Sequence, residues 1–274
     1  MPGKTPDKTT VHILGCGTMH CDLTWLLLQP GRAIADRSNP HKPAEWIECP
    51  CHAVVVDHPE GRLLWDTSCP RDWETHWKET GLQEFFPYDN VSEEEYLDSR
   101  LRQLDLSVSD FDMVVLSHLH FDHCGNAQLF ANSGARMICS KPEYDGAFGF
   151  DGAFKAAHIK ADYDGLPWET VDGDTELLPG VRVLQTPGHT WGTMSLQVDL
   201  ADSGPMIFTS DAIYMQASYG PPPVGAGIVY DSLAWLASVE KIRSIAEKTN
   251  PTLVFGHDPD QIHDLRLAPQ GSYT

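Results

Sequence analysis

Short apolar runs of strand length recur along the chain, separated by polar segments that contain glycine or proline. Runs of this kind, rich in β-branched residues and bounded by turn residues, predict β-strands. Strands are therefore expected from one end of the chain to the other. The predicted strands are residues 11–14, 53–57, 63–66, 113–117, 136–139, 181–186, 195–198, 206–210 and 253–255.

Two segments between these strands carry apolar residues at helical spacing. The first opens with Ser92 and Glu95, a capping-box pattern, and apolar residues then follow at positions 96, 97, 101 and 104. The second starts after Asp231 and stops at Asn250, which precedes Pro251. Helices mixed with strands along the whole chain predict α/β layers rather than an all-β sandwich.

Nothing in the sequence marks a linker or an internal repeat, so residues 1–274 are expected to form one domain. The stretch 143–174 is rich in Gly and Asp and carries scattered aromatic residues, which predicts a helical lid or an insertion. Its aromatic side chains are either the core of that lid or contacts for an apolar substrate, and the sequence does not choose between them. These aromatics are Phe148, Phe150, Phe154, Tyr163 and Trp168.

Composition narrows the classes of partner. The hydrophobic fraction of 41% can fill a sizeable core, and the formal net charge is −20. Such a surface repels nucleic-acid phosphates and anionic lipid, and no apolar run approaches the roughly 18 residues of a membrane span. We therefore expect neither a nucleic acid nor a membrane as partner. The polar N-terminus and the odd set of seven cysteines predict a cytoplasmic protein with reduced thiols.

The most informative segment is Ser117-His118-Leu119-His120-Phe121-Asp122-His123, which follows an apolar run. On an extended chain, His118 and His120 face the same way and can converge on one ion. A turn after them would aim Asp122 and His123 at a neighbouring position. Imidazole and carboxylate are ligands that zinc accepts at about 2.0–2.2 Å. The segment therefore predicts a metal centre rather than a solvated histidine-rich loop.

Three further predicted strands each end at a single potential ligand, namely His189, Asp211 and His257. Each of these residues alone would be weak evidence, because lone loop histidines and turn aspartates are common. Strand ends gathered at one sheet edge are, however, where α/β folds place their sites. Together with the histidine-rich segment, they supply enough ligands for two metal ions that share one carboxylate.

The order His-x-His-x-Asp-His, then a lone His, a lone Asp and a final His, resembles the metallo-β-lactamase superfamily of hydrolases over nearly the whole chain. That resemblance implies a four-layer αβ/βα sandwich, with two mixed sheets flanked by helices and two Zn²⁺ ions in a cleft at the sheet edges. It implies three ligand roles. One zinc would be held by His118, His120 and His189, the other by Asp122, His123 and His257, and Asp211 would bridge them.

Within this superfamily, the chain is most similar to the N-acyl homoserine lactonases, which open quorum-sensing signals. Those enzymes carry a tyrosine three residues after the bridging aspartate, and Tyr214 occupies that place after Asp211. Glyoxalase II-like members append a helical domain for which the stretch after His257 is too short, and flavodiiron members have glutamate where His120 stands. Two departures are Ser68, where the family's usual Asp-Thr-Gly ends, and the unmatched segment 25–46. Because of these departures, the residues of the acyl-chain pocket are not identified by the resemblance.

The resemblance implies a metal-dependent hydrolase, and we hypothesise that a metal-bridging hydroxide attacks the carbonyl of a small lactone. Tyr214 would donate a hydrogen bond to the developing oxyanion, and Asp122 would pass a proton to the leaving alkoxide. The alternative for Tyr214 is a buried phenol that bonds a backbone group. A same-fold hydrolase of another lactone, aryl ester, β-lactam or phosphotriester stays open, as does a non-catalytic metal-binding protein. The same ligands accept manganese, cobalt or iron, and the fold is compatible with a homodimer.

The remaining histidines and the cysteines receive ordinary interpretations. Cys49-Pro50-Cys51 with His52 lacks a second cysteine pair at zinc-ribbon spacing, so it is assigned to packing. Histidines without ligand partners in the sequence are expected at the surface. These are His12, His41, His58, His76, His158 and His263.

Overall fold

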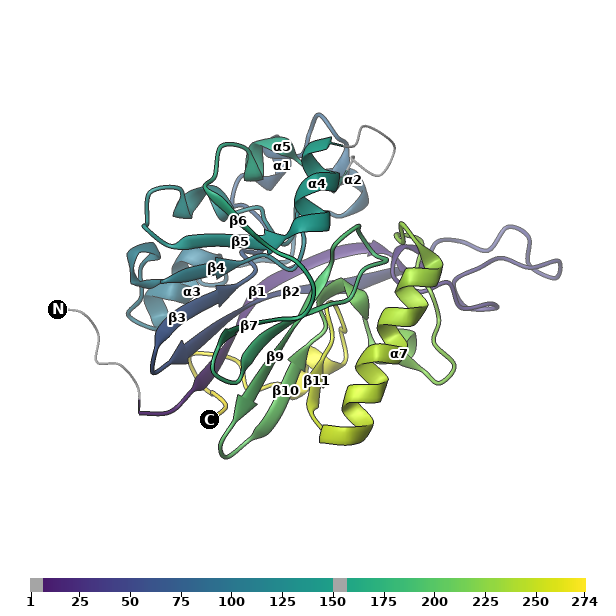
Figure 1. Cartoon of the computed structure of the whole chain (residues 1–274). Helices are drawn as coiled ribbons and strands as arrows, with labels where there is room; N and C mark the ends of the chain where they lie inside the picture. Colours follow the sequence, from purple (N-terminus) through teal and green to yellow (C-terminus); the bar gives the residue numbers. More distant parts are fainter. Residues whose placement is uncertain (1–6, 150–156) are drawn as a thin grey trace.

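A computed structural model describes residues 7–149 and 157–274. Two mixed β-sheets face each other, and helices cover their outer faces (Figure 1). The six-stranded sheet has the order β1-β2-β3-β4-β5-β6, and the five-stranded sheet has the order β11-β10-β9-β8-β7. The predicted α/β sandwich of two mixed sheets flanked by helices is confirmed.

The six-stranded sheet combines antiparallel and parallel pairing. Strands β1, β2 and β3 pair antiparallel, whereas β3 to β6 pair parallel. The connection between β1 and β2, which contains the unmatched segment of the sequence, extends away from the body of the molecule (Figure 1). The strands are β1 (Thr10–Asp22), β2 (Trp46–His58), β3 (Gly61–Trp65), β4 (Met113–Val115), β5 (Arg136–Ser140) and β6 (Trp168–Val171).

The five-stranded sheet is antiparallel except for its β10–β11 pair. Every predicted strand is present, but β6 and β7 were not predicted. Both lie at sheet edges and have exposed positions, so their sequences carry polar residues in place of a continuous apolar run. The strands are β7 (Thr175–Leu178), β8 (Val181–Gln185), β9 (Met194–Leu200), β10 (Gly204–Phe208) and β11 (Thr252–Val254).

Both predicted helices are present. Helix α7 begins after Asp231, whose side chain accepts hydrogen bonds from the Leu233 and Ala234 amides, and it ends at Asn250 in the left-handed conformation. In the other segment, Ser92 and Glu95 do bond each other, but the helix itself starts only at Leu97. The α-helices are α1 (Trp73–His76), α2 (Leu82–Phe85), α3 (Leu97–Gln103), α4 (Lys141–Gly149), α5 (Lys160–Tyr163), α6 (Gln216–Tyr219) and α7 (Ser232–Thr249). The 3₁₀ turns are η1 (Leu23–Trp25), η2 (Val108–Asp110), η3 (Ala127–Phe130), η5 (Ser210–Ala212) and η6 (Gln261–Asp264).

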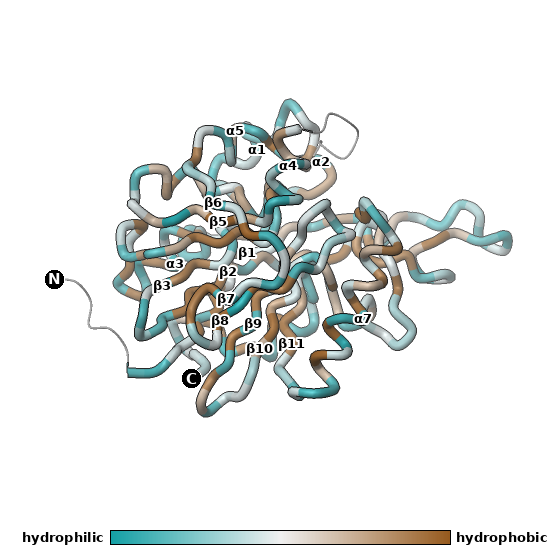
Figure 2. The backbone as a smooth tube through the Cα atoms, in the orientation of Figure 1, coloured by the Kyte–Doolittle hydropathy of each residue, from teal (hydrophilic) through white to brown (hydrophobic). Residues whose placement is uncertain are grey.

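Apolar side chains fill three layers. On β2, Val54 and Val56 point into the core between the sheets, while Ala53 and Val55 point into the core under the helices of the six-stranded sheet. Burial on both faces explains why the central strands are continuously apolar, as the brown strands in Figure 2 show. Helix α7 packs on the outer face of the five-stranded sheet through a third, smaller cluster that includes Trp235.

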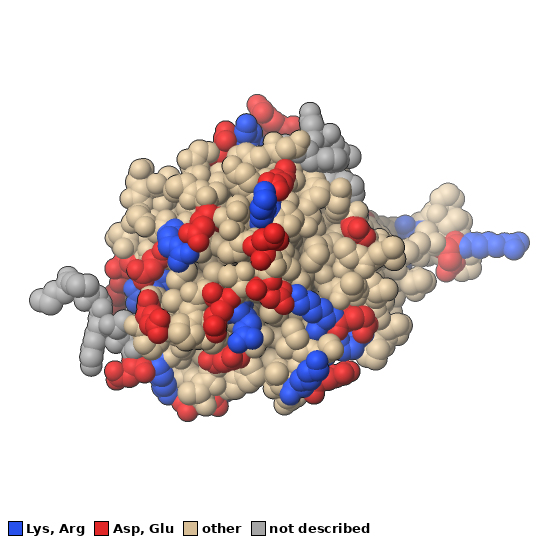
Figure 3. Space-filling model, in the orientation of Figure 1, with Lys and Arg blue, Asp and Glu red and all other residues tan. Residues whose placement is uncertain are grey.

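The predicted lid segment, residues 143–174, contributes most of α4, then α5 and β6. Phe148 and Trp168 pack against the core of the six-stranded sheet and Tyr163 is fully buried in it, which favours the lid-core interpretation for these three aromatics. Phe150 and Phe154 lie outside the described residues. In the described ranges, no helix combines the length and hydrophobicity needed to cross a bilayer. Acidic and basic side chains are interspersed on the face shown in Figure 3.

Candidate metal centre

The predicted ligand residues all follow the ends of strands at one edge of the two sheets. The segment after β4 carries His118, His120, Asp122 and His123, and the ends of β8, β10 and β11 deliver the rest. Strand β8 leads to His189, β10 to Asp211 in η5, and β11 to His257. Every one of these side chains is buried, with at most 8% of its surface exposed. The structure thus brings together the full predicted set.

A first group consists of His118, His120, His189 and Asp211. The Nε2 atom of His189 lies 3.1 Å from Nε2 of His118 and 2.9 Å from Nδ1 of His120. It also lies 3.2 Å from Oδ2 of Asp211. Three imidazole nitrogens and a carboxylate oxygen therefore converge on one point, as the ligands of a four-coordinate ion do.

A second group consists of Asp122, His123 and His257. The Nε2 atoms of His123 and His257 lie 3.6 and 3.5 Å from Oδ2 of Asp122. The same two nitrogens lie 3.1 and 3.2 Å from Oδ1 of Asp211. Asp211 thus directs one carboxylate oxygen to each group.

The donor atoms of the centre suit a cation. Among the described residues, the buried atoms His123 Nε2 and Asp211 Oδ1 have no hydrogen-bond partner, although they lie 3.1 Å apart. Leaving such buried polar atoms without a hydrogen bond is costly, and coordination of a cation would satisfy both of them. Neutral imidazole and carboxylate are also a chemically appropriate set for zinc and related divalent ions. The residues present therefore fit a dinuclear metal centre.

Contacts on the far side of the rings fix their orientation. The outer Nδ1 of His123 donates to Oδ2 of Asp66 at 2.9 Å, and that of His257 donates to the Pro50 carbonyl at 2.9 Å. Asp66 also accepts from the Ser117 amide and hydroxyl. In the first group, Nδ1 of His118 lies 3.0 Å from the Ser117 hydroxyl. Such outer contacts hold each imidazole in the orientation that a ligand needs.

The two groups differ in their electrostatics. Burial lowers the pKa of His118 well below its usual value, with the neighbouring His123 and His189 adding to it. Burial likewise lowers the pKa of His120 and of His189.

In the second group, burial acts in the same direction but the carboxylates of Asp211 and Asp122 outweigh it. They hold the pKa of His123 well above its usual value and raise that of His257 to about 10. Burial alone would raise the pKa of Asp211, but the neighbouring histidines hold it well below the usual range. Without a metal ion, the three histidines of the first group are neutral, whereas the second group forms a cluster of ion pairs with Asp211.

Tyr214 lies against both groups. Its ring stacks on His257 with centroids 6.1 Å apart, and its hydroxyl lies 2.6 Å from Nδ1 of His189. The hydroxyl also donates to the Ile228 carbonyl at 3.1 Å. This backbone bond is the contact expected of a buried phenol, and it places the oxygen beside the outer nitrogen of a first-group histidine.

Two cavities lie on this side of the molecule; the smaller is lined by two of the predicted ligands, whereas none of them lines the larger. A small one of about 10 Å³ lies between His120, His189, Trp191 and Tyr230. It shares Thr190, Trp191 and Tyr230 with a broad groove of about 620 Å³ beside α4. The centre is therefore close to the surface at this point.

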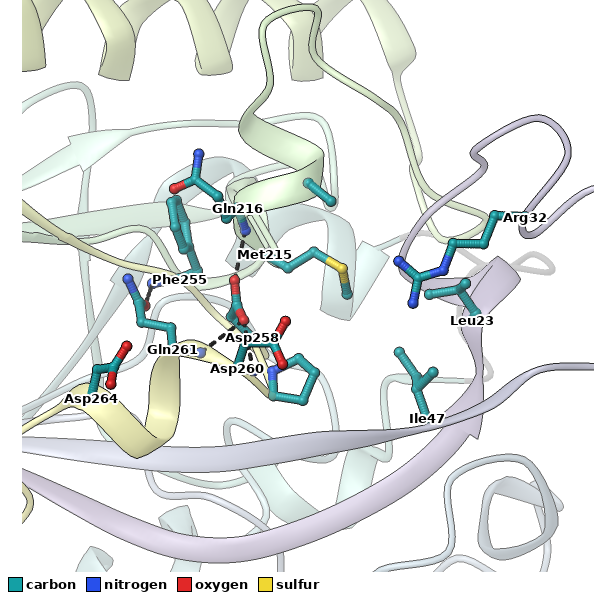
Figure 4. A pocket seen from close by; sticks show the side chains of 12 residues that line it. Leu23, Arg32, Ile47, Met215, Gln216, Phe255, Asp258, Asp260, Gln261 and Asp264 are labelled. Carbon is teal, nitrogen blue, oxygen red and sulfur yellow. Dashed lines mark hydrogen bonds between the residues drawn. The ribbon is translucent and has the colours of Figure 1, made fainter.

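The other cavity, of about 390 Å³, lies beside the segment that follows His257 (Figure 4). Asp258 there accepts from the Gln216 amide at 2.7 Å. Backbone bonds from the His257 amide to the Tyr214 carbonyl and from the Gly256 amide to the Ile213 carbonyl run alongside. The segments that carry Asp211, Tyr214 and His257 are thereby joined to one another.

Two histidines expected at the surface are buried, so that prediction was wrong for them. His58 contacts the Pro179 carbonyl at 3.1 Å. His158 donates from Nε2 to Glu143 at 3.0 Å, and its ring centroid lies 4.5 Å from that of His120. Burial of both was invisible in the sequence because it depends on segments far away in the chain.

Sequence reasoning also missed Asp66 and Glu143, which orient the ligand segments. Asp66 could have been found, because it follows the end of β3 just as the ligands follow their strands. Nothing comparable marks Glu143. The assignment of Cys49 and Cys51 to packing agrees with their burial, and neither joins a metal-binding group among the residues described.

A family model and a protein of known activity each match most of this chain. Residues 46–257 match the model of the metallo-beta-lactamase superfamily. The N-acyl homoserine lactonase AiiB of Rhizobium rhizogenes is 34% identical over 250 residues, which span 85% of this chain and 90% of that protein.

Solved structures share the fold at lower identity. An N-acyl homoserine lactone hydrolase with the product N-hexanoyl-L-homoserine at its catalytic metal centre superposes with a TM-score of 0.79, at 24% identity and over 97% of this chain and 99% of its own. The dizinc quorum-quenching lactonase AidC gives a TM-score of 0.68 at 18% identity, over 94% of this chain and 90% of its own.

Proposed function

The chain belongs to the metallo-beta-lactamase superfamily, and from this premise we propose that it is a metal-dependent hydrolase that opens the ester bond of an N-acyl homoserine lactone. The observation that carries the proposal is the pair of buried His/Asp groups sharing Asp211 at the edge of the two sheets. The relative from Rhizobium rhizogenes, at 34% identity, supports the lactone as substrate.

We propose the ligand roles that follow from the two groups. His118, His120 and His189 would hold one ion, Asp122, His123 and His257 the other, and Asp211 would contact both. Zinc is the proposed metal, although manganese, cobalt or iron would suit the same donors. When bound, a pair of such ions supplies an acidic water as nucleophile precursor and a Lewis acid for the carbonyl.

The protein's own side chains would position the substrate and move the protons. Tyr214 would turn its hydroxyl from the Ile228 carbonyl toward the lactone carbonyl and donate to the oxyanion as charge develops. Asp122 lies within 3.6 Å of two ligand histidines and would carry a proton to the departing alkoxide oxygen. Burial of the whole set excludes bulk water and strengthens each of these interactions.

The proposal also covers the compartment, the domain organisation, the assembly and the partner of the protein. All seven cysteines are free and buried, which supports a reducing, cytoplasmic environment. We propose that the chain forms one hydrolase domain, with residues 143–174 as a lid or an insertion within it, and that a homodimer is its assembly. Its partner would be a small lactone, without a role for nucleic acid or membrane.

Elemental analysis combined with a substrate series tests the proposal. We expect about two divalent ions per chain and hydrolysis of homoserine lactones that depends on acyl-chain length. Chelation should abolish turnover, zinc should restore it, and Asp211→Ala should have neither activity nor full metal content. A panel containing an aryl ester, a β-lactam and a phosphotriester identifies a different scissile bond if only one of these is turned over. Absence of bound metal after zinc loading would contradict the proposal as a whole.

A further inference from the structure

Glu143 is a fully buried carboxylate in the first turn of α4, outside both metal-binding groups. Its Oε1 accepts hydrogen bonds from the Leu119 amide and from Nε2 of His158, each at 3.0 Å. Its Oε2 accepts from the Gly192 amide at 3.1 Å. One side chain therefore collects donors from three separate segments.

These donors are placed selectively. Leu119 stands between His118 and His120, while Gly192 closely follows His189. Glu143 thus joins the two segments that carry all three histidines of the first group. The second group is attached elsewhere, because the His123 carbonyl accepts from Thr67 and the His257 amide donates to the Tyr214 carbonyl.

Close packing between the segment after His189 and the start of α4 leaves the hydrogen bonds of Glu143 little freedom to shift. A Cβ at Gly192 would lie 2.4 Å from the Glu143 amide nitrogen and 2.0 Å from the Ser140 hydroxyl. The Ser140 hydroxyl in turn donates to the Gly192 carbonyl at 2.7 Å. The segment after His189 is therefore seated directly on the start of α4, and a displacement of the carboxylate would move it.

Glu143 is also suited to this task by its charge. Burial raises the pKa of a carboxyl, but the hydrogen bonds from His158 and the Leu119 amide outweigh it and hold the pKa of Glu143 below its usual value. An ionised carboxylate accepts on both oxygens, and charge-assisted bonds are stronger than neutral ones.

We propose that Glu143 is a positioning residue that sets the affinity of the first metal-binding group without contacting the metal. The inference rests on the dinuclear function proposed above and adds a residue that neither ligand spacing nor strand ends predict. Its alternative is a general structural role, in which Glu143 supports the fold and both groups equally. Selectivity for one group distinguishes the two.

The test is a zinc titration against a competing chelator, with the full-length chain and the variant Glu143→Gln. Glutamine keeps the volume but points an amide donor at Leu119 and His158 or at Gly192. The hydrogen bonds to one of the two ligand-bearing segments are therefore lost. We expect one of the two zinc affinities to fall about 10–100-fold, the range found for outer contacts of metal ligands, and the other to stay unchanged. Asp145→Asn is the matched control, since it removes a surface carboxylate that pairs with Lys141 on the same helix.

Combination with Asp66→Asn identifies the affected group. Asp66 contacts His123 of the second group, so the double variant should bind both ions weakly, whereas each single variant weakens one. Ser140→Ala removes the hydroxyl that donates to the Gly192 carbonyl and provides a milder variant should Glu143→Gln not fold, with the same one-sided loss expected at smaller size. Wild-type affinity at both groups in a folded variant, or an equal loss at both, would overturn the inference. A wild-type chain that binds fewer than two ions would instead contradict the proposed function.

Discussion

The two halves of the metal centre are built on different principles although they share Asp211. The first half consists of three histidines whose pKa values burial lowers. The two segments that carry them both donate backbone hydrogen bonds to Glu143. In the second half, Asp122 and Asp211 raise the pKa values of His123 and His257 against the effect of burial. Asp66 supports His123 directly.

The difference shows how one site can hold two like charges close together. The three neutral histidines of the first half are held in place by hydrogen bonds and packing, so they need no counter-charge before a cation binds. A cluster of ion pairs is held by the same carboxylates that a cation would engage, so binding there replaces one set of charges by another. Asp211 couples the halves because each of its oxygens faces one of them.

The largest effect is expected from Tyr214, whose ring touches the second half and whose hydroxyl touches the first. If the phenol donates to the oxyanion, Tyr214→Phe should lower kcat for a homoserine lactone about 10²–10³-fold, the usual cost of losing one such donor. Metal content and KM should change little. Steady-state kinetics beside metal analysis measures this, and full turnover on every substrate would assign the hydroxyl to its bond with the Ile228 carbonyl.

A smaller, one-sided effect is expected from Asp66→Asn. The amide cannot accept on both sides from His123 and Ser117, so zinc affinity of the second half should fall about 10–100-fold. That of the first half should fall much less, because Asp66 reaches His118 only through the Ser117 hydroxyl. Chelator competition measures both affinities. Asp199→Asn, on β9, where the carboxylate accepts from Gln197, is the remote control, and equal weakening of the two halves would show that they are not separately supported.

The smallest effect concerns His52. This residue lies beside the second half, but its pKa is lowered, like those of the first-half histidines. Burial, together with the charges of His257 and His123, lowers its pKa to about 3, against about 6.5 in an unfolded chain. Below pH 6.5 the unfolded chain therefore binds a proton that the folded chain does not. This histidine thus reduces the free energy of unfolding as the pH falls, by at most about 1.4 kcal/mol per pH unit.

Replacing His52 by glutamine should remove that loss. Urea unfolding of zinc-loaded wild type and His52→Gln at pH 7, 6 and 5 measures it, and a bound cation nearby leaves the sign unchanged because it further opposes protonation. The variant should gain stability relative to wild type at each step down. A constant difference between the two proteins across this range would show that His52 does not titrate between the folded and unfolded states.

The strands and both main helices were predictable because their signals are local. Apolar runs mark the central strands, and Asp231 and Asn250 mark the ends of α7. The candidate ligand positions were predictable for the same reason, since each follows a strand end. Strands β6 and β7 escaped because edge strands are half exposed, and the start of α3 was displaced because its capping-box residues close a turn before the helix.

By itself, the sequence determined the candidate ligand side chains and the strands that deliver them, because ligand type and periodicity are properties of short segments. Only the tertiary structure decided that His158 is buried against His120, that Asp66 supports the second half, and that Glu143 joins the two segments of the first. These contacts link residues up to 57 positions apart. They depend on how the sheets and helices pack, which no short segment encodes.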